Sequence, residues 1–209
     1  IAVEIDKELC GLLSSKFSSS RNFKLLNKDI LKTNLVNLRG CQGLGKLKLI
    51  ANIPYYISTP IIAHLLRYKE SIEVIYISLQ KELAKRLIAC PGSKAYGAFS
   101  CFAQFYSQPK ILFPIKNGSF WPKPKVASSF VELKILSAPK VKVKDEESFF
   151  KIIRLAFSQR RKVLKNSLGK IAPEKKLISC LNRLGIPQTV RAEALSLEDF
   201  AQLAGCLCV

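Results

Sequence analysis

The sequence predicts an α/β protein in which an open, mainly parallel sheet layered by helices precedes a small all-helical domain. In the first part of the chain, short apolar runs alternate with stretches of helical periodicity, a pattern typical of a sheet covered by helices. A proline and alternating lysines in residues 137–145 indicate a linker, and only helical patterns follow it. A chain of 209 residues is long enough for one domain of ordinary size and a smaller one.

Strands are expected where short runs are apolar and rich in β-branched side chains, at residues 1–5, 23–26, 47–51, 73–79, 110–115 and 126–135. The last two are expected at the far edge of the sheet. Helices are expected at residues 8–17, 59–66, 81–89 and 98–106, where length favours a helix over a strand for the last. Thr59 and Pro60 suit the N-cap and the first position of their helix.

The domain boundaries follow from these elements. We expect the sheet domain at residues 1–136, the linker at 137–146 and the helical domain at 147–209. Glycine and proline divide the helical domain into helices expected at 147–167, 173–184 and 197–207.

The charge balance indicates a polyanionic partner. Lys and Arg number 34 against 15 Asp and Glu, a formal net charge of +19. A surplus of this size creates a positive potential that attracts nucleic acid. A need for solubility or binding to anionic lipid would also explain the positive charge, but the sequence contains no separate amphipathic segment that would anchor it to a membrane.

The cysteines do not form a recognisable site. They are odd in number and scattered, at Cys10, Cys41, Cys90, Cys101, Cys180, Cys206 and Cys208, without a Cys-x-x-Cys pair. This pattern argues against a metal site or a disulfide framework and favours a reducing cytoplasm. No apolar run approaches the ~18 residues of a membrane span.

Two acidic residues are candidates for binding an adenosine cofactor. Glu4 ends an expected strand, where a carboxylate can accept hydrogen bonds from both ribose hydroxyls. Asp29 follows the next short strand and could accept from the adenine amine. Acids at strand ends are common, and Asp29 could equally be an N-cap or Asx-turn residue.

The strongest chemical motif is Asn52-Ile53-Pro54-Tyr55, directly after the apolar strand at 47–51. The side-chain carbonyl of Asn52 and the backbone carbonyl of Ile53 or Pro54 can accept from an amine and aim its lone pair at a sulfonium methyl group. Pro54 stiffens the turn, and the Tyr55 ring offers a face for an extruded base. The alternative is a polar turn before a helix start.

With these residues in view, the chain resembles the ribosomal RNA adenine dimethyltransferase family. The phrases that carry the resemblance are ANIPYYISTP (51–60), QKELAKRL (80–87), PGSKAYG (91–97), FWPKPKV (120–126) and AFSQRRK (156–162). The resemblance implies a Rossmann-like methyltransferase domain, S-adenosylmethionine as methyl donor without a metal, and two transfers to the N6 amine of adenines in small-subunit (16S-type) ribosomal RNA. It also implies a role in ribosome biogenesis.

The resemblance also assigns roles by position. Catalytic roles fall on Asn52, Pro54, Tyr55 and Phe120, and cofactor binding on Glu4, Asp29, Ile30 and Asn52. Phe120 would close over the target base, although it could also be a core aromatic residue. The family's first strand and glycine-rich loop are expected to be missing from this polypeptide, and Lys28 stands where the family usually has glycine.

A basic face is expected on the helix that opens the second domain. Lys151, Arg154, Ser158, Arg161 and Lys165 recur there at three- and four-residue steps, opposite an apolar stripe. The full set of RNA-binding candidates is Lys123, Lys125, Lys151, Arg154, Arg160, Arg161, Lys162 and Lys165. Such a face can hold phosphates without reading sequence, although a solvated cationic face would look the same.

Several alternatives remain at this point. Erythromycin-resistance methylases of large-subunit RNA share the Asn-x-Pro-Tyr motif, whereas DNA adenine methylases generally carry Asp-Pro-Pro-Tyr. A non-catalytic RNA-binding or assembly factor would keep the fold without turnover. We expect a cytoplasmic monomer that acts on the precursor of the 30S subunit, without a membrane partner.

Overall fold

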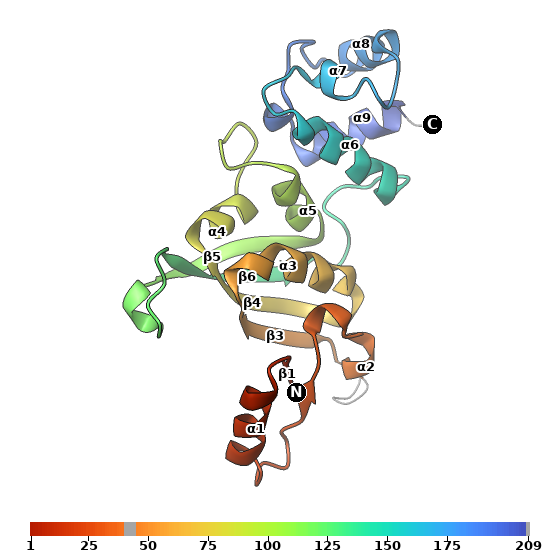
Figure 1. Ribbon diagram of the computed structural model, residues 1–209. Helices are drawn as coiled ribbons and strands as arrows, with labels where there is room; N and C mark the ends of the chain where they lie inside the picture. Colours follow the sequence, from red (N-terminus) through yellow and green to blue (C-terminus); the bar gives the residue numbers. More distant parts are fainter. Residues whose placement is uncertain (40–44, 208–209) are drawn as a thin grey trace.

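The computed structural model describes residues 1–39 and 45–207 (Figure 1). Cys41 lies outside the described residues, as do Cys208 and Val209, the last two residues of the expected helical domain. The α/β class and the helical C-terminal part are confirmed, and nearly all expected elements are found within a few residues of their predicted ends.

The strands form two sheets rather than one. In the smaller sheet, β1 (Ala2–Glu4) pairs in parallel with β2 (Leu25–Asn27). The larger sheet has the order β3-β4-β6-β5 and consists of β3 (Leu47–Asn52), β4 (Ile72–Gln80), β5 (Ser107–Ile115) and β6 (Ser128–Ile135). Only β3 and β4 pair in parallel there, because β6 runs antiparallel to both β4 and β5.

Helices cover the larger sheet on the side that faces the helical domain (Figure 1). The sheet part contains α1 (Lys7–Lys16), α2 (Val36–Arg39), α3 (Ser58–Arg67), α4 (Lys81–Leu87) and α5 (Ala98–Tyr106). The helical part contains α6 (Glu146–Ser158), α7 (Leu164–Ser167), α8 (Glu174–Arg183) and α9 (Leu197–Leu207). Asp6 caps α1 by accepting from two backbone N–H groups, whereas the expected cap Thr59 lies inside α3, which begins one residue earlier.

The two parts share one continuous core. Phe105 on α5 packs against Phe149 and Phe150 on α6, with ring centroids 5.2 and 5.0 Å apart. The Tyr106 hydroxyl donates to the Glu146 carboxylate, and burial is the main reason that the pKa of Tyr106 is raised above its ordinary value. The expected linker is fastened to this junction, since the Lys140 N–H donates to the Phe105 carbonyl over 2.9 Å.

The prediction of one continuous helix over 147–167 is wrong. α6 ends at Ser158, and the chain makes a turn before α7 begins at Leu164. Arg160 explains part of this break, because its guanidinium donates to the carbonyl oxygens of Lys94 and Tyr96 and to the Glu193 carboxylate over 2.9 to 3.1 Å. Tertiary hydrogen bonds here prevail over the helical periodicity of the sequence.

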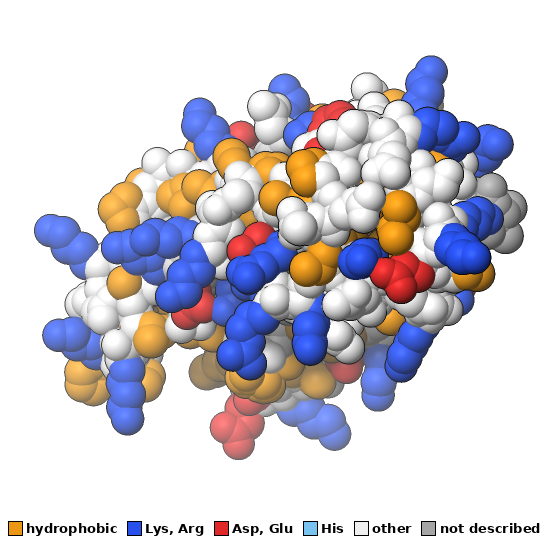
Figure 2. All heavy atoms as spheres, turned by 90° about the horizontal axis from the view of Figure 1, so that it is seen from above, with side chains coloured by type: hydrophobic (Ala, Val, Ile, Leu, Met, Phe, Trp, Pro, Cys, Tyr) orange, Lys and Arg blue, Asp and Glu red, His pale blue; other side chains and the backbone are white. Residues whose placement is uncertain are grey.

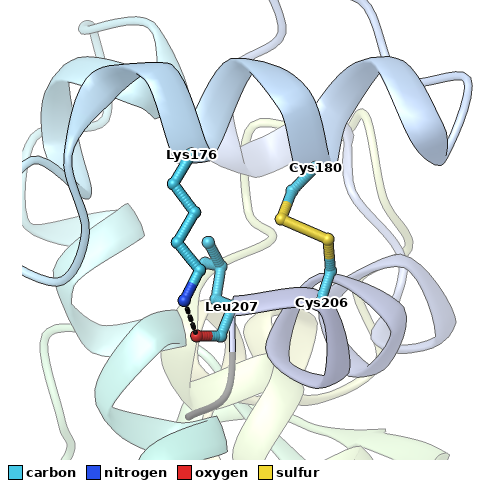
Figure 3. Close-up of a disulfide and its surroundings, with 4 residues drawn as sticks. All are labelled: Lys176, Cys180, Cys206 and Leu207. Atoms are coloured by element: carbon cyan, nitrogen blue, oxygen red, sulfur yellow. Dashed lines mark hydrogen bonds between the residues drawn. A yellow bond between two sulfur atoms is a disulfide. The ribbon is translucent and has the colours of Figure 1, made fainter.

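The sequence argued against a disulfide framework, but the structure contains one disulfide. Cys180 on α8 and Cys206 on α9 are bonded, with their Cα atoms 5.9 Å apart (Figure 3). The ammonium group of Lys176 donates to the carbonyl oxygen of Leu207 beside this bond over 3.0 Å. Sequence spacing did not reveal the pair, because it forms between two helices that pack against each other 26 residues apart.

Reducing this disulfide is expected to lower the free energy of unfolding by about 3 kcal/mol, because a loop of this length gains chain entropy in the unfolded state. Urea unfolding with and without dithiothreitol measures the effect. The double variant Cys180→Ser, Cys206→Ser should not respond to the reductant. Equal stability of the wild type in both buffers would contradict the prediction.

Candidate active site

The Asn-Ile-Pro-Tyr motif forms the end of β3 and the turn that follows. Pro54 has a φ of −59°, and its carbonyl oxygen accepts from the Ile57 N–H and from the Ser58 hydroxyl, each over 3.3 Å. The proline ring and these two hydrogen bonds fix the turn before α3. Asn52 is therefore presented at the carboxyl end of β3, exposed and close to the surface.

Asn52 is oriented by the neighbouring strand. Asn52 lies beside Ser78 in the β3–β4 ladder, and Ser78 lies beside Phe130 in the β4–β6 ladder. The buried hydroxyl of Ser78 donates to the side-chain oxygen of Asn52. This bond fixes which end of the Asn52 amide is the acceptor and leaves the amide NH₂ directed elsewhere.

Tyr55 is attached to the sheet in a similar way. Its phenol group forms a hydrogen bond with the hydroxyl of Ser128, which is fully buried at the start of β6. The half-buried ring is therefore held between the turn and β6. The two ends of the motif are thus tied to two different strands.

An open cavity of about 430 Å³ lies in front of Asn52. Its walls are Ile50, Ala51, Asn52, Ser78, Ile115, Ser119, Phe120 and Phe130. Phe120 comes from the loop between β5 and β6, which is closed by a 3.1 Å hydrogen bond from the Asn117 amide to the Pro124 carbonyl. Phe120 is half-buried and lines this cavity, so it does not belong to the buried core. The cavity has mostly apolar walls with three polar residues, Asn52, Ser78 and Ser119, as expected for a small-molecule or base-binding site.

Ser78 is a positioning residue that the sequence reading missed, and Ser78→Ala is expected to lower kcat about tenfold, because an unanchored acceptor loses alignment. The KM for the acceptor should stay unchanged. Steady-state methylation assays at varied RNA concentration measure both constants. Ser107→Ala is the matched control, since it removes another buried hydroxyl that donates within the protein, to the Ala103 carbonyl. A similar loss of rate in both variants would show that general destabilisation is the cause.

Glu4 and Asp29 lie near the ends of the paired strands β1 and β2 and are not among the residues that line the cavity. The Glu4 carboxylate accepts from the Asp6 N–H over 2.9 Å. Asp29 caps the short 3-10 helix Ile30–Lys32 by accepting from the Leu31 N–H over 2.9 Å. Asn27 joins the two strand ends by donating to the carbonyl oxygens of Glu4 and Ile5 over 3.0 Å. Each carboxylate has a second oxygen that these bonds do not use.

The basic candidates fall into two groups. Lys123, Lys125, Lys151, Arg154, Arg161 and Lys162 are exposed. Arg160 is engaged within the protein as described above, and the ammonium group of Lys165 donates to Glu174 over 2.8 Å. Residues 157–162 line a surface hollow of about 540 Å³ that contains the Arg160, Arg161 and Lys162 side chains. Lys and Arg side chains are spread over the face seen from the helical domain (Figure 2).

Other kinds of site find no support in the described part of the chain. Within residues 1–39 and 45–207, no three His, Cys, Asp or Glu side chains are grouped so that they could hold a metal ion. No helix in these ranges is long and apolar enough to cross a membrane. The single histidine, His64, lies in α3 and is hydrogen-bonded to the Thr33 carbonyl over 3.1 Å, as expected of a packing residue.

The sequence matches the ribosomal RNA adenine dimethylase family over residues 1–207. Ribosomal RNA small subunit methyltransferase A of Clostridium botulinum is 39% identical over 207 residues, which are 99% of this chain and 74% of that protein. The protein of the same name from Lachnoclostridium phytofermentans is 42% identical over 210 residues, covering 98% of this chain and 72% of the relative.

Solved structures support the fold. A dimethyladenosine transferase from Plasmodium falciparum aligns with a TM-score of 0.79 at 22% identity, covering 96% of this chain and 78% of that one. The 23S rRNA methyltransferase ErmE aligns with a TM-score of 0.72 at 20% identity, covering 98% and 80%. At these identities the likeness concerns the fold alone.

Proposed function

The chain belongs to the ribosomal RNA adenine dimethylase family, and from this premise we propose that it transfers methyl groups from S-adenosylmethionine to the N6 amine of adenines in small-subunit ribosomal RNA. The product is N6,N6-dimethyladenosine. The observation that carries this proposal is the Asn52 side-chain oxygen, oriented by Ser78 at an open cavity that Phe120 lines from the β5–β6 loop.

The acceptor amine would be held by two oxygens. The Asn52 side-chain carbonyl has two lone pairs, of which Ser78 uses one, so it can accept one amine hydrogen. The Pro54 carbonyl already accepts two hydrogen bonds, and the Ile53 carbonyl therefore becomes the better second acceptor. Two acceptors on the amine hydrogens turn the nitrogen lone pair out of conjugation with the ring and toward the donor.

The target base must leave its stack to reach this site. The Tyr55 ring and the Phe120 ring, on the turn and on the β5–β6 loop, supply aromatic faces for an extruded adenine. No strong general base is needed beforehand, because the amine proton becomes acidic only after nitrogen is alkylated. His64, hydrogen-bonded inside the protein, therefore needs no catalytic role.

The residues at the ends of β1 and β2 fit an adenosine-containing donor, which supplies an electrophilic methyl group when bound. The unused oxygen of Glu4 can accept from a ribose hydroxyl, and that of Asp29 from an adenine amine. Ile30, half-buried beside Asp29, can cover the adenine ring. These are acceptors matched to the hydrogen-bond donors of the nucleoside.

The exposed cations would hold the RNA backbone. Lys151 and Arg154 on α6, Arg161 and Lys162 in the following turn, and Lys123 and Lys125 beside Phe120 provide the charge. Arg160 and Lys165 can contribute only if they give up hydrogen bonds within the protein. We place the enzyme as a monomer in the cytoplasm, acting on the precursor of the small ribosomal subunit.

RNA affinity is expected to fall about tenfold when the salt concentration is doubled from 100 mM, because four to five neutralised phosphates release their counterions. Filter binding of a small-subunit RNA fragment over a salt series measures the slope. A flat response would contradict binding through phosphates.

The experiment that tests the proposed function uses labelled S-adenosylmethionine and under-methylated small ribosomal subunits. Dimethyladenosine in the digested RNA would support donor, acceptor and reaction together. RNA binding without any methyl transfer would instead favour an assembly factor. Methylation of large-subunit RNA alone would overturn the choice of substrate.

A further inference from the structure

The loop between β5 and β6 carries a second aromatic residue that the proposed chemistry does not use. Trp121 is the single tryptophan of the chain and follows Phe120 directly. Phe120 lines the cavity, whereas the Trp121 side chain is 98% exposed. The two adjacent aromatic side chains thus have different surroundings: Phe120 lines the cavity, and Trp121 lies in solvent.

Two other large hydrophobic side chains, one in the cavity wall and one next to the Asn-Ile-Pro-Tyr motif, are also strongly exposed. Among the large hydrophobic side chains that the structure describes, the three most exposed are Trp121 at 98%, Tyr56 at 85% and Ile50 at 78%. Ile50 lines the cavity, Tyr56 follows Tyr55 and Trp121 follows Phe120. Large apolar side chains left in solvent beside a site indicate a surface that a ligand covers.

The charge of the loop defines the kind of ligand. Between Ser107 and Val131 the sequence contains no Asp or Glu but has Lys110, Lys116, Lys123 and Lys125. The loop projects beyond the sheet in Figure 1, and at that end of the molecule Figure 2 shows Lys and Arg side chains with hydrophobic ones between them. Aromatic rings among cations and without acids are the elements that bind single-stranded nucleic acid, through base stacking and phosphate contacts.

We propose that Trp121 stacks on a nucleotide next to the target adenine and so holds the RNA strand over the cavity. The inference rests on the proposed function and extends it with a positioning residue for the RNA. An extruded adenine leaves a neighbouring base unstacked, and the Trp121 ring lies one residue away from the ring that lines the cavity. The lysines on either side of the ring neutralise the phosphates of the same strand.

The single tryptophan allows a direct test by intrinsic fluorescence of the wild-type chain. Oligoadenylate should quench the emission, because a base stacked on the indole ring quenches its excited state. Inorganic polyphosphate, which has the charge but no bases, should bind without comparable quenching. Equal quenching by both polyanions, or none by oligoadenylate, would overturn the proposal.

Variants then test the positioning role. Trp121→Ala is expected to raise the KM for small ribosomal subunits about tenfold with kcat nearly unchanged, and Trp121→Phe should restore most of the loss because a ring remains. Leu12→Ala, which truncates another exposed side chain on α1, should have no effect. An unchanged KM in Trp121→Ala would overturn the proposal while methylation by the wild type stands. Base-dependent quenching without methylation would support stacking and count against the proposed function instead.

Discussion

Replacing Asn52 with alanine is expected to lower the rate of methyl transfer about 100- to 1,000-fold, the effect of removing one aligned hydrogen-bonding group from a reaction centre. The variant loses the side-chain oxygen that would hold the amine, while the turn remains fixed by Pro54 and its two hydrogen bonds. RNA affinity should stay nearly unchanged, because the cations proposed to contact the phosphates lie on other elements. Single-turnover assays with enzyme in excess over RNA measure the rate, and filter binding measures the affinity.

Two controls make this result interpretable. Asn182→Ala removes an exposed amide on α8, far along the chain from the cavity, and should leave the rate unchanged. The melting temperature of Asn52→Ala should fall by several degrees without loss of folding at the assay temperature, because the orphaned Ser78 hydroxyl costs about 1–3 kcal/mol. A parallel loss of rate and RNA affinity would show that Asn52 is structural.

The second large effect is expected at the junction of the two parts. Phe105→Ala should lower the free energy of unfolding by about 3–5 kcal/mol, since it leaves a cavity between α5 and α6. The ring is fully buried and contacts Phe149 and Phe150 at centroid distances of 5.2 and 5.0 Å. Urea unfolding followed by circular dichroism measures the loss.

Trp121→Ala is the matched control for this variant. It also removes a large aromatic side chain, but this side chain is 98% exposed and is not part of the buried core. Its unfolding midpoint should stay within experimental error of the wild type. A small loss in Phe105→Ala would mean that the sheet and the helices are stabilised independently.

Local periodicity was sufficient to predict most elements of the fold. The apolar run at β4 and the helical pattern of α5 and α9 were each found where the sequence placed them. The pairing of strands was harder, because the separation into two sheets depends on hydrogen bonds between segments distant in sequence. The break after α6 is explained in part by hydrogen bonds from Arg160 to residues 66 and 64 positions away, which no local pattern contains.

In the candidate site too, local motifs could be predicted from the sequence, but contacts between distant segments could not. Asn52, Pro54 and Tyr55 are recognisable because they are contiguous, and Phe120 because its own phrase is distinctive. Ser78 and Ser128 were missed, although a polar residue inside the apolar strand Ile72–Gln80 is a signal that could have been followed. Their roles arise only when neighbouring strands bring them beside the motif.

The hydrogen bonds of Arg160 have a consequence for the choice of substrate. They join the turn after α6 to the loop before α5, and so add to the buried core that the two parts share. Under the proposed function, these bonds would help to set the distance between the cations of the helical part and the cavity. An RNA in which the adenine lies at the wrong distance from the phosphates would then be bound but not methylated. The spacing between these groups would select substrates in addition to the chemistry of the base.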